Sequence, residues 1–173
     1  MATLCAPQIS LVVLTADDHC YPIDSRWVGQ SGLFREMLDT DDENKGSSES
    51  SCLLKNILKP QMERVLEFME LHHHTPMPTI PKPLPGQSTL VVLVGNAFSN
   101  LVEIPHAELF SLINAAAYLE IQPLLDLACA KMATLIIDKT PEQIRETFGI
   151  VNDFTPEEEE RARQENLWST SGL

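Results

Sequence analysis

The sequence predicts an α+β fold in which short mixed elements precede an all-helical part. Three observations support this prediction. Short apolar runs rich in β-branched residues lie in the N-terminal third, apolar residues recur at helical spacing after Leu109, and two helix-start signatures lie near the C-terminus. The 173 residues suffice for one compact domain with a hydrophobic core and an extension.

The N-terminal part is predicted to begin with a β-hairpin. Ile9–Leu14 is an apolar, β-branched run, Thr15–Asp18 contains turn residues, and Cys20–Ile23 is a second short strand. A helix is expected next, because Ser31 is a favoured N-cap residue and apolar side chains then recur at helical spacing, at Leu33, Phe34, Met37 and Leu38.

Two segments interrupt these elements. Residues 39–51 are acidic and Ser-rich and contain no apolar side chain, which predicts a mobile loop. Residues 53–58 are predicted to form a strand, and Pro60 suits the first turn of a helix whose buried face contains Val65, Leu66, Phe68, Met69 and Leu71. A second break begins at His72, and its dense prolines predict a second mobile loop near 75–88.

The second half is predicted to be helical, although Thr89–Val94, just before it, is apolar enough to be a strand without an evident neighbour. One amphipathic helix is indicated by Leu109, Phe110, Leu112, Ile113, Ala116 and Leu119. Another begins near Pro123 and is indicated by Leu124, Leu125, Ala128, Met132, Leu135 and Ile136.

Two capping boxes predict two further helices at the end of the chain. The first is Thr140-Pro141-Glu142-Gln143, and Gly149 ends its helix as a left-handed cap. The second is Thr155-Pro156-Glu157-Glu158, with acidic residues at the positive end of the helix dipole.

These two terminal helices have too few apolar residues to hold themselves in place. Two interpretations follow for Phe148, Ile150, Phe154 and Trp168. They could dock on the protein's own core, or they could complete the core of a partner and become ordered on binding. Aromatic side chains in a charged surround are typical of binding hot spots, which favours the second interpretation.

The acidic composition excludes several classes of partner. The formal net charge is −13 and the isoelectric point is about 4.6, which argues against binding to nucleic acid or to an anionic membrane surface. No apolar run approaches the ~20 residues of a membrane span, and no basic residue precedes Arg26 to form a secretory signal. Free thiols are therefore expected at Cys5, Cys20, Cys52 and Cys129, and we expect the protein in the cytoplasm and nucleus.

The sequence offers no motif for catalysis or for a cofactor. Phosphate-loop, dinucleotide-binding and nucleophile-elbow motifs are missing, so we expect no catalytic residues and no cofactor. His72–His74 is the one metal-like cluster, and it is interpreted as an exposed helix end rather than a metal site. Cys129 lies within a helical apolar pattern and is predicted to be a packing residue. The sequence therefore indicates an interaction protein.

Four segments of the chain match the motifs of one known family. They are Ala115–Ile121 with Leu124–Leu127, Lys139–Ile150, Asn152–Glu159 and Glu165–Trp168, which are similar to the family runs AANYLDI with LLD, KTPEEIRxxFxI, NDFTxEEE and ENxW. On these motifs the chain resembles the S-phase kinase-associated protein-one adaptors of SCF ubiquitin ligases. The resemblance extends from Ile9 to Trp168 and is most specific after Leu109.

The resemblance implies a BTB/POZ-like domain over residues 1–138 and an F-box-binding helical extension over 139–173. It implies a non-catalytic adaptor that joins F-box substrate receptors to a cullin scaffold for ubiquitin-dependent degradation. Tyr118 is the residue it assigns to the cullin. The residues that it assigns to the F-box are Leu109, Phe110, Ile113, Met132, Phe148, Ile150, Asn152, Phe154, Asn166 and Trp168.

The chain departs from the family pattern at Ala117, where the family has Asn, and within Val91–Leu101, where the family's Trp has no counterpart. These departures keep open an alternative adaptor that binds an F-box-type helix in a cullin-independent assembly. A metal-binding or enzymatic role for His72–His74 is a third hypothesis. In some unicellular members the matching proline is hydroxylated and glycosylated, which makes Pro141 a candidate modification site. Whether the free protein forms a homodimer is open.

Overall fold

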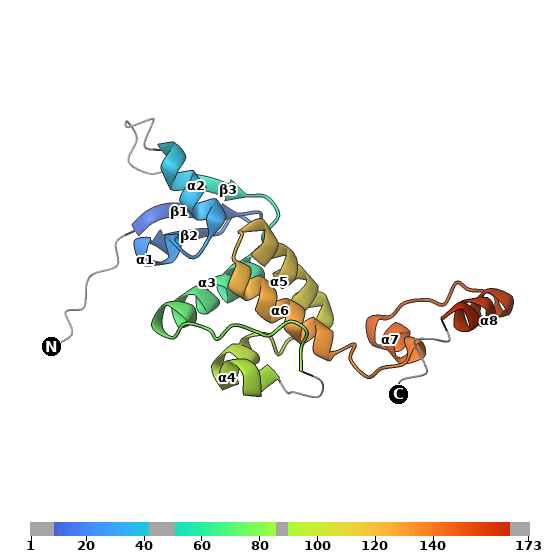
Figure 1. Cartoon of the computed structure of the whole chain (residues 1–173). Coiled ribbons are helices and arrows are strands. Elements are labelled where there is room, and N and C mark those ends of the chain that lie inside the picture. The colour runs from blue at the N-terminus through green and yellow to red at the C-terminus, as the bar shows by residue number, and fades with distance from the viewer. Residues whose placement is uncertain (1–8, 42–50, 86–89, 167–173) are drawn as a thin grey trace. The chain divides into compact units, whose positions relative to one another are not determined.

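The computed structural model describes residues 9–41, 51–85 and 90–166. The chain forms two compact units, Met1–Ile137 and Asp138–Leu173, here called the first and the second unit. The first unit contains β1 (Ile9–Thr15), β2 (Cys20–Asp24), α1 (Ser25–Val28), α2 (Gly32–Asp41), β3 (Ser51–Leu54), α3 (Lys59–His74), α4 (Leu90–Leu101), α5 (His106–Tyr118) and α6 (Gln122–Thr134). The second contains α7 (Pro141–Phe148) and α8 (Pro156–Glu165) (Figure 1). The predicted α+β class is confirmed.

A three-stranded sheet in the order β2-β1-β3 forms one side of the first unit. The predicted hairpin is confirmed, since β1 and β2 are antiparallel with Leu14 opposite Cys20. β3 then pairs in parallel with β1, with Leu14 opposite Leu53. Alternate side chains of β1, at Leu11, Val13 and Thr15, are buried, as expected for a sheet with one face on the core.

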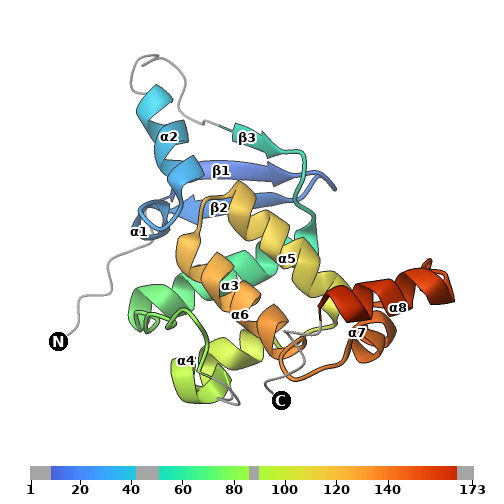
Figure 2. The same cartoon turned by 45° about the vertical axis from the view of Figure 1, so that its right-hand side comes forward.

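The helices of the first unit enclose a single hydrophobic core with the buried face of the sheet. Figures 1 and 2 both show α5 and α6 side by side, with α3 next to them. Among the largest fully buried side chains are Phe34 of α2, Phe68 of α3, and Leu109, Leu112 and Leu124 of α5 and α6. Because these residues come from elements far apart in the sequence, the core joins the whole unit.

The start of α2 is fixed to the turn between α5 and α6. Ser31 is fully buried, and its hydroxyl donates to the carbonyl of Leu119 while it accepts the N–H of Phe34 at 3.2 Å. The predicted N-cap role of Ser31 is thereby confirmed. The next residue is Gly32, where a Cβ would collide with the side chain of Glu120. The backbone carbonyl of Glu120 accepts the Gly32 N–H at 3.3 Å.

Several sequence predictions need correction. The strand predicted over Thr89–Val94 is wrong for residues 90–94, because Leu90–Leu101 forms α4, which is interrupted at Gly95 by a backbone φ of +83°, while Thr89 lies outside the described residues. The strand predicted over 53–58 is the shorter β3, which ends at Leu54. The acidic loop is also shorter than 39–51, because α2 continues to Asp41 and β3 begins at Ser51, while the rest of that prediction lies outside the described residues.

The break predicted from His72 onward begins only at Thr75, since α3 continues through His74. The imidazole of His72 stacks on Phe68 with ring centres 5.3 Å apart, and it meets the ring of Phe98 edge-on. Its Nδ1 accepts the backbone N–H of Met77 at 3.0 Å, which ties the proline-rich segment to α3. Burial lowers the pKa of His72 below its ordinary value of 6.5.

In the described part of the chain, no single helix is long and apolar enough to cross a membrane, whereas α4 and α5 reach that length and composition only as a pair bent by 95°. Most apolar side chains of this pair are packed in the core of the first unit.

We expect Ser31→Ala to lower the free energy of unfolding by about 2 kcal/mol, because it removes a helix cap and leaves a buried N–H and a buried carbonyl unpaired. Urea denaturation measures this change. Ser111→Ala is the control, since its hydroxyl bonds only within α5, to Ala107 at 3.2 Å, and a loss under about 0.5 kcal/mol is expected there. An equally small loss for Ser31→Ala would contradict the bridging role.

Folding stability should fall as the pH drops below 6.5, because the unfolded chain then binds a proton at His72 more readily than the folded chain does. Protonation of Nδ1 would also remove the acceptor for the Met77 N–H. Denaturation curves recorded at steps of about 0.5 pH units between pH 7 and pH 5 give the slope of the free energy of unfolding against pH. We expect this slope to be smaller in His72→Phe than in the unaltered chain. The exposed His74 provides the control, and a slope that survives His72→Phe but not His74→Phe would refute the assignment.

Candidate functional site

The helix α7 is defined by hydrogen bonds at both ends. Thr140 and Gln143 form the predicted capping box, in which each side chain accepts the backbone N–H of the other, at 3.0 and 3.3 Å. At the other end Gly149 adopts the left-handed conformation, with φ of +64°, and the N–H of Ile150 reaches the Arg145 carbonyl at 2.9 Å. This Schellman arrangement fixes the direction in which the chain leaves α7.

The helix α8 begins in the same way. Its N-cap Thr155 accepts the Glu158 N–H at 3.4 Å, and the Glu158 carboxylate accepts the Thr155 N–H at 2.9 Å. The pKa of Glu158 is held below its ordinary value by two hydrogen bonds from Thr155. The bond from the Thr155 backbone has the larger effect, and the bond from its hydroxyl the smaller. Glu142 in α7 also has a lowered pKa, through a backbone N–H and the Thr140 hydroxyl. Both predicted capping boxes are confirmed.

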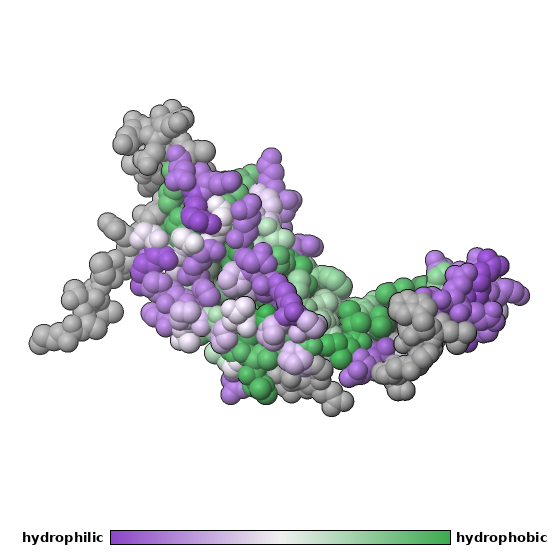
Figure 3. Space-filling model, in the orientation of Figure 1, coloured by the Kyte–Doolittle hydropathy of each residue, from purple (hydrophilic) through white to green (hydrophobic). Residues whose placement is uncertain are grey.

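Neither helix buries a side chain among its described residues. Ile150, Val151 and Phe154, in the segment that joins them, are 55%, 83% and 52% exposed. Figure 3 shows hydrophobic surface beside α7 and hydrophilic surface over α8. A partner that covers such exposed apolar side chains lowers the free energy of the system, because it removes their surface from water. Val151 was not a candidate from the sequence, although its place directly after Ile150 beyond the capping glycine could have indicated it.

Arg145 connects the two helices and the segment between them. Its Nη1 lies 3.2 Å from Oε1 of Glu159 on α8. Its guanidinium carbon lies 5.9 Å from the centre of the Phe154 ring, a cation–π distance. Sequence reasoning missed this contact, because helix periodicity relates residues three or four positions apart and Arg145 and Glu159 are 14 apart.

A hollow of about 640 Å³ lies between these elements of the second unit. Arg145 and Phe154 line it together with Thr140, Pro141, Glu142, Glu159, Ala162, Arg163 and Asn166. Pro141 is exposed at the first turn of α7, where the missing N–H of proline leaves no helix bond unmade. Charged groups and an aromatic ring in the same lining match a polypeptide partner with apolar and polar side chains.

The predicted F-box-facing residues of the first unit differ in exposure. Phe110 is 47% exposed on α5, whereas Ile113 and Met132 are partly buried against the core. Leu109 is fully buried, so its side chain supports α5 from inside rather than facing a partner in this structure. Tyr118, predicted to face a cullin, is 39% exposed at the end of α5.

In the second unit, Phe148 is partly buried and Ile150, Asn152, Phe154 and Asn166 are exposed. The Asn152 side chain accepts the N–H of Phe154 at 3.3 Å, and the Asn166 side chain donates to the Ala162 carbonyl at 2.7 Å. Asn152 therefore also shapes the backbone beside the exposed Phe154, and Asn166 caps the end of α8. Trp168 lies outside the described residues.

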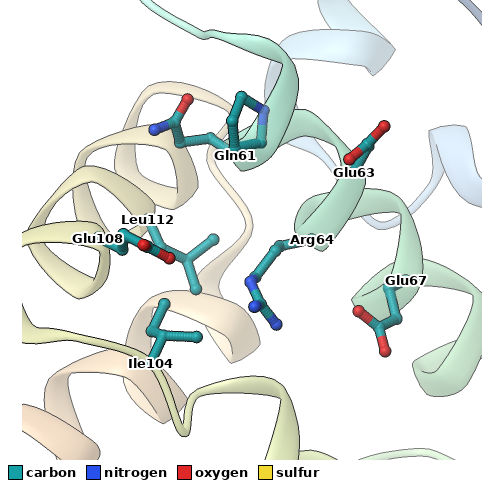
Figure 4. Close-up of a pocket in the computed structure, with 8 residues that line it drawn as sticks. Gln61, Glu63, Arg64, Glu67, Ile104, Glu108 and Leu112 are labelled. Carbon is teal, nitrogen blue, oxygen red and sulfur yellow. The ribbon is translucent and has the colours of Figure 1, made fainter.

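The first unit has a smaller groove of about 300 Å³ between α3 and α5. Arg64 points into it from α3, opposite Glu108 and Leu112 of α5 (Figure 4). Nη1 of Arg64 donates to the Leu101 carbonyl at 3.2 Å, which joins α3 to the end of α4. The arginine in this groove thus has a structural role.

The described residues contain no group of three or more His, Cys, Asp or Glu side chains placed to hold a metal ion. Cys129 corrects a further prediction, because it is exposed on α6 while the neighbouring Ala128 takes the buried position. Partial desolvation and the Asp126 carboxylate raise the pKa of the Cys129 thiol, which disfavours the nucleophilic thiolate.

Comparison with known proteins gives consistent matches. Residues 122–169 match the family model described as Skp1 family, dimerisation domain. An S-phase kinase-associated protein 1 homolog of Tetrahymena thermophila is 41% identical over 158 residues, which cover 91% of this chain and 92% of that protein. The SCF ubiquitin ligase complex protein SKP1a of Dictyostelium discoideum is 36% identical, covering 92% of this chain and 96% of its own length. The E3 ubiquitin ligase complex SCF subunit sconC of Arthroderma otae is 32% identical, covering 96% and 98%.

Proposed function

The chain belongs to the Skp1 family, and on this basis we propose that it is the adaptor subunit of an SCF-type E3 ubiquitin ligase. In this role it links F-box substrate receptors to a cullin scaffold and performs no catalytic step itself. Relatives across much of its length are named as subunits of SCF complexes, which supports a role in assembly.

One observation carries this proposal: the second unit has well-capped helices but no buried side chain among its described residues. Ile150, Val151 and Phe154 are exposed beside α7 and α8, where the apolar face of a partner helix could cover them. An F-box receptor supplies such a helical partner. Burial of these side chains would then stabilise the complex by ~25 cal/mol for each Å² of apolar surface removed from water.

The proposed contacts with the two partners come from different residues. For the receptor they are Phe110, Ile113, Met132, Phe148, Ile150, Asn152, Phe154, Asn166 and Trp168. For the cullin we propose Tyr118, which is 39% exposed and whose hydroxyl gives the aromatic side chain a polar end. Separate contact residues would allow one adaptor to hold both proteins at once.

A second candidate function is an adaptor for F-box-type helices outside a cullin ligase. Ala117, the neighbour of Tyr118, motivates it, since a methyl group stands where the family has an amide side chain. A hollow of about 380 Å³ lies here, lined by Ala116, Ala117, Glu120, Ile121, Gln122 and Leu125. A cullin that relies on the amide would bind this chain weakly.

Two variants test the proposed contacts against each other. Phe154→Ala should reduce capture of F-box receptors about 30-fold and leave cullin capture intact, since loss of an aromatic anchor costs ~2 kcal/mol. Tyr118→Ala should weaken cullin capture and leave receptor capture intact. Pull-down with quantitative mass spectrometry measures both, so each variant is the control for the other.

Three outcomes would change the assignment. Receptor capture unchanged in Phe154→Ala removes this residue from the interface. Receptor capture by the unaltered chain without any cullin favours the cullin-independent adaptor. A chain that captures neither class of protein contradicts the proposed function as a whole.

Association with receptors should slow as salt is added. Residues 152–173 contain six acidic and two basic side chains, a net charge of −4, which would steer a partner rich in Lys and Arg. Stopped-flow or biosensor association rates should therefore fall between ~0.05 and ~0.5 M NaCl, while dissociation rates change little. Association rates that do not respond to salt would count against steering by these acids.

A further inference from the structure

Arg145 contacts all three parts of the second unit. Its side chain reaches Glu159 on α8 at 3.2 Å and Phe154 in the joining segment at 5.9 Å from the ring centre. Its carbonyl accepts the Ile150 N–H at 2.9 Å, directly before the exposed Val151. One residue of α7 is therefore linked to the position of Ile150, Phe154 and α8.

The ion pair with Glu159 is better shielded from water than its neighbour within α8. The side chains of Arg145 and Glu159 are 21% and 31% exposed, whereas those of Arg163 and Glu160 are 60% and 57% exposed. Shielded charges interact more strongly than fully solvated ones, and they are less weakened by salt. Since α7 and α8 bury no side chain, such contacts carry a large share of what holds these helices together.

We propose that Arg145 is a positioning residue that sets the arrangement of Phe154 and α8 before a partner arrives. The identity of the partner in this inference rests on the proposed function, because the surface that Arg145 arranges is the one proposed to bind an F-box helix. A receptor that meets a preformed surface does not lose affinity to an unfavourable conformational equilibrium. Without Arg145 the competent arrangement becomes a minority state, and binding has to wait for it.

Preorganisation and direct contact predict different kinetics. If Arg145 positions the surface, its loss lowers the fraction of competent molecules and hence the association rate. If Arg145 instead contacts the receptor, its loss mainly raises the dissociation rate. The association rate is therefore the measurement that separates the two roles.

The experiment compares Arg145→Gln with Arg161→Gln in the full chain. Arg161 is the matched control, because it is an exposed arginine on α8 and its replacement changes the net charge equally. The probe is the purified F-box domain of a receptor retained in the pull-down, immobilised on a biosensor. We expect about a tenfold lower association rate for Arg145→Gln, with a dissociation rate within about twofold of the unaltered chain. Arg161→Gln should stay within about twofold in both rates.

A second measurement needs no partner. Hydrogen exchange of the Ile150 amide should accelerate in Arg145→Gln and also in Glu159→Gln, which removes the same ion pair from the other side. The Gln143 and Glu158 amides should keep their protection, because they bond within their own capping boxes.

Each result decides the matter. An unchanged association rate, or a change confined to dissociation, overturns the positioning role while receptor binding by the unaltered chain still stands. Loss of protection at Gln143 and Glu158 as well would mean that Arg145 stabilises the helices themselves, which also overturns it. If the unaltered chain binds no F-box domain, the proposed function fails, and hydrogen exchange alone then decides whether Arg145 positions the second unit.

Discussion

In the second unit the backbone groups at the helix ends have hydrogen-bond partners, whereas the described apolar side chains nearby are not buried. The N-caps Thr140 and Thr155, and the left-handed Gly149, provide partners for helix-end groups that would otherwise depend on water. The apolar side chains nearby have no such solution, since Phe154 and Ile150 remain more than half exposed. Helix shape and hydrophobic burial are thus separated in the described part of this unit.

The first unit shows the opposite relation. Its sheet and helices share one core, and even a polar group such as the Ser31 hydroxyl is buried with both of its partners. That unit can therefore present Phe110 and Tyr118 on a rigid α5, while the second unit depends on a few polar contacts around Arg145. The proposed contact residues of the first unit therefore stand on a packed core, whereas those of the second unit do not.

Local signals in the sequence were the reliable ones. Both capping boxes, the hairpin and the cap at Ser31 depend on residues a few positions apart, and all four are confirmed. α4 was missed because an apolar run with Gly95 inside it fits either a strand or a helix, and only tertiary packing decides. For the same reason the pattern could not separate Leu109, which is buried, from Phe110, which is exposed. The contacts of Arg145 with Glu159 and Phe154 could not be predicted, because they depend on how α7 and α8 pack against each other.

The parallel pairing of β3 with β1 has a consequence for how the chain folds. Val13 pairs with Cys52, so the sheet closes only after a stretch of 39 residues (52 − 13) has been brought back on itself. Contacts in the second unit are short-range by comparison, the longest described ion pair joining residues 14 positions apart. Because chain closure slows with sequence separation, α7 and α8 should assemble and come apart many times while the sheet forms once.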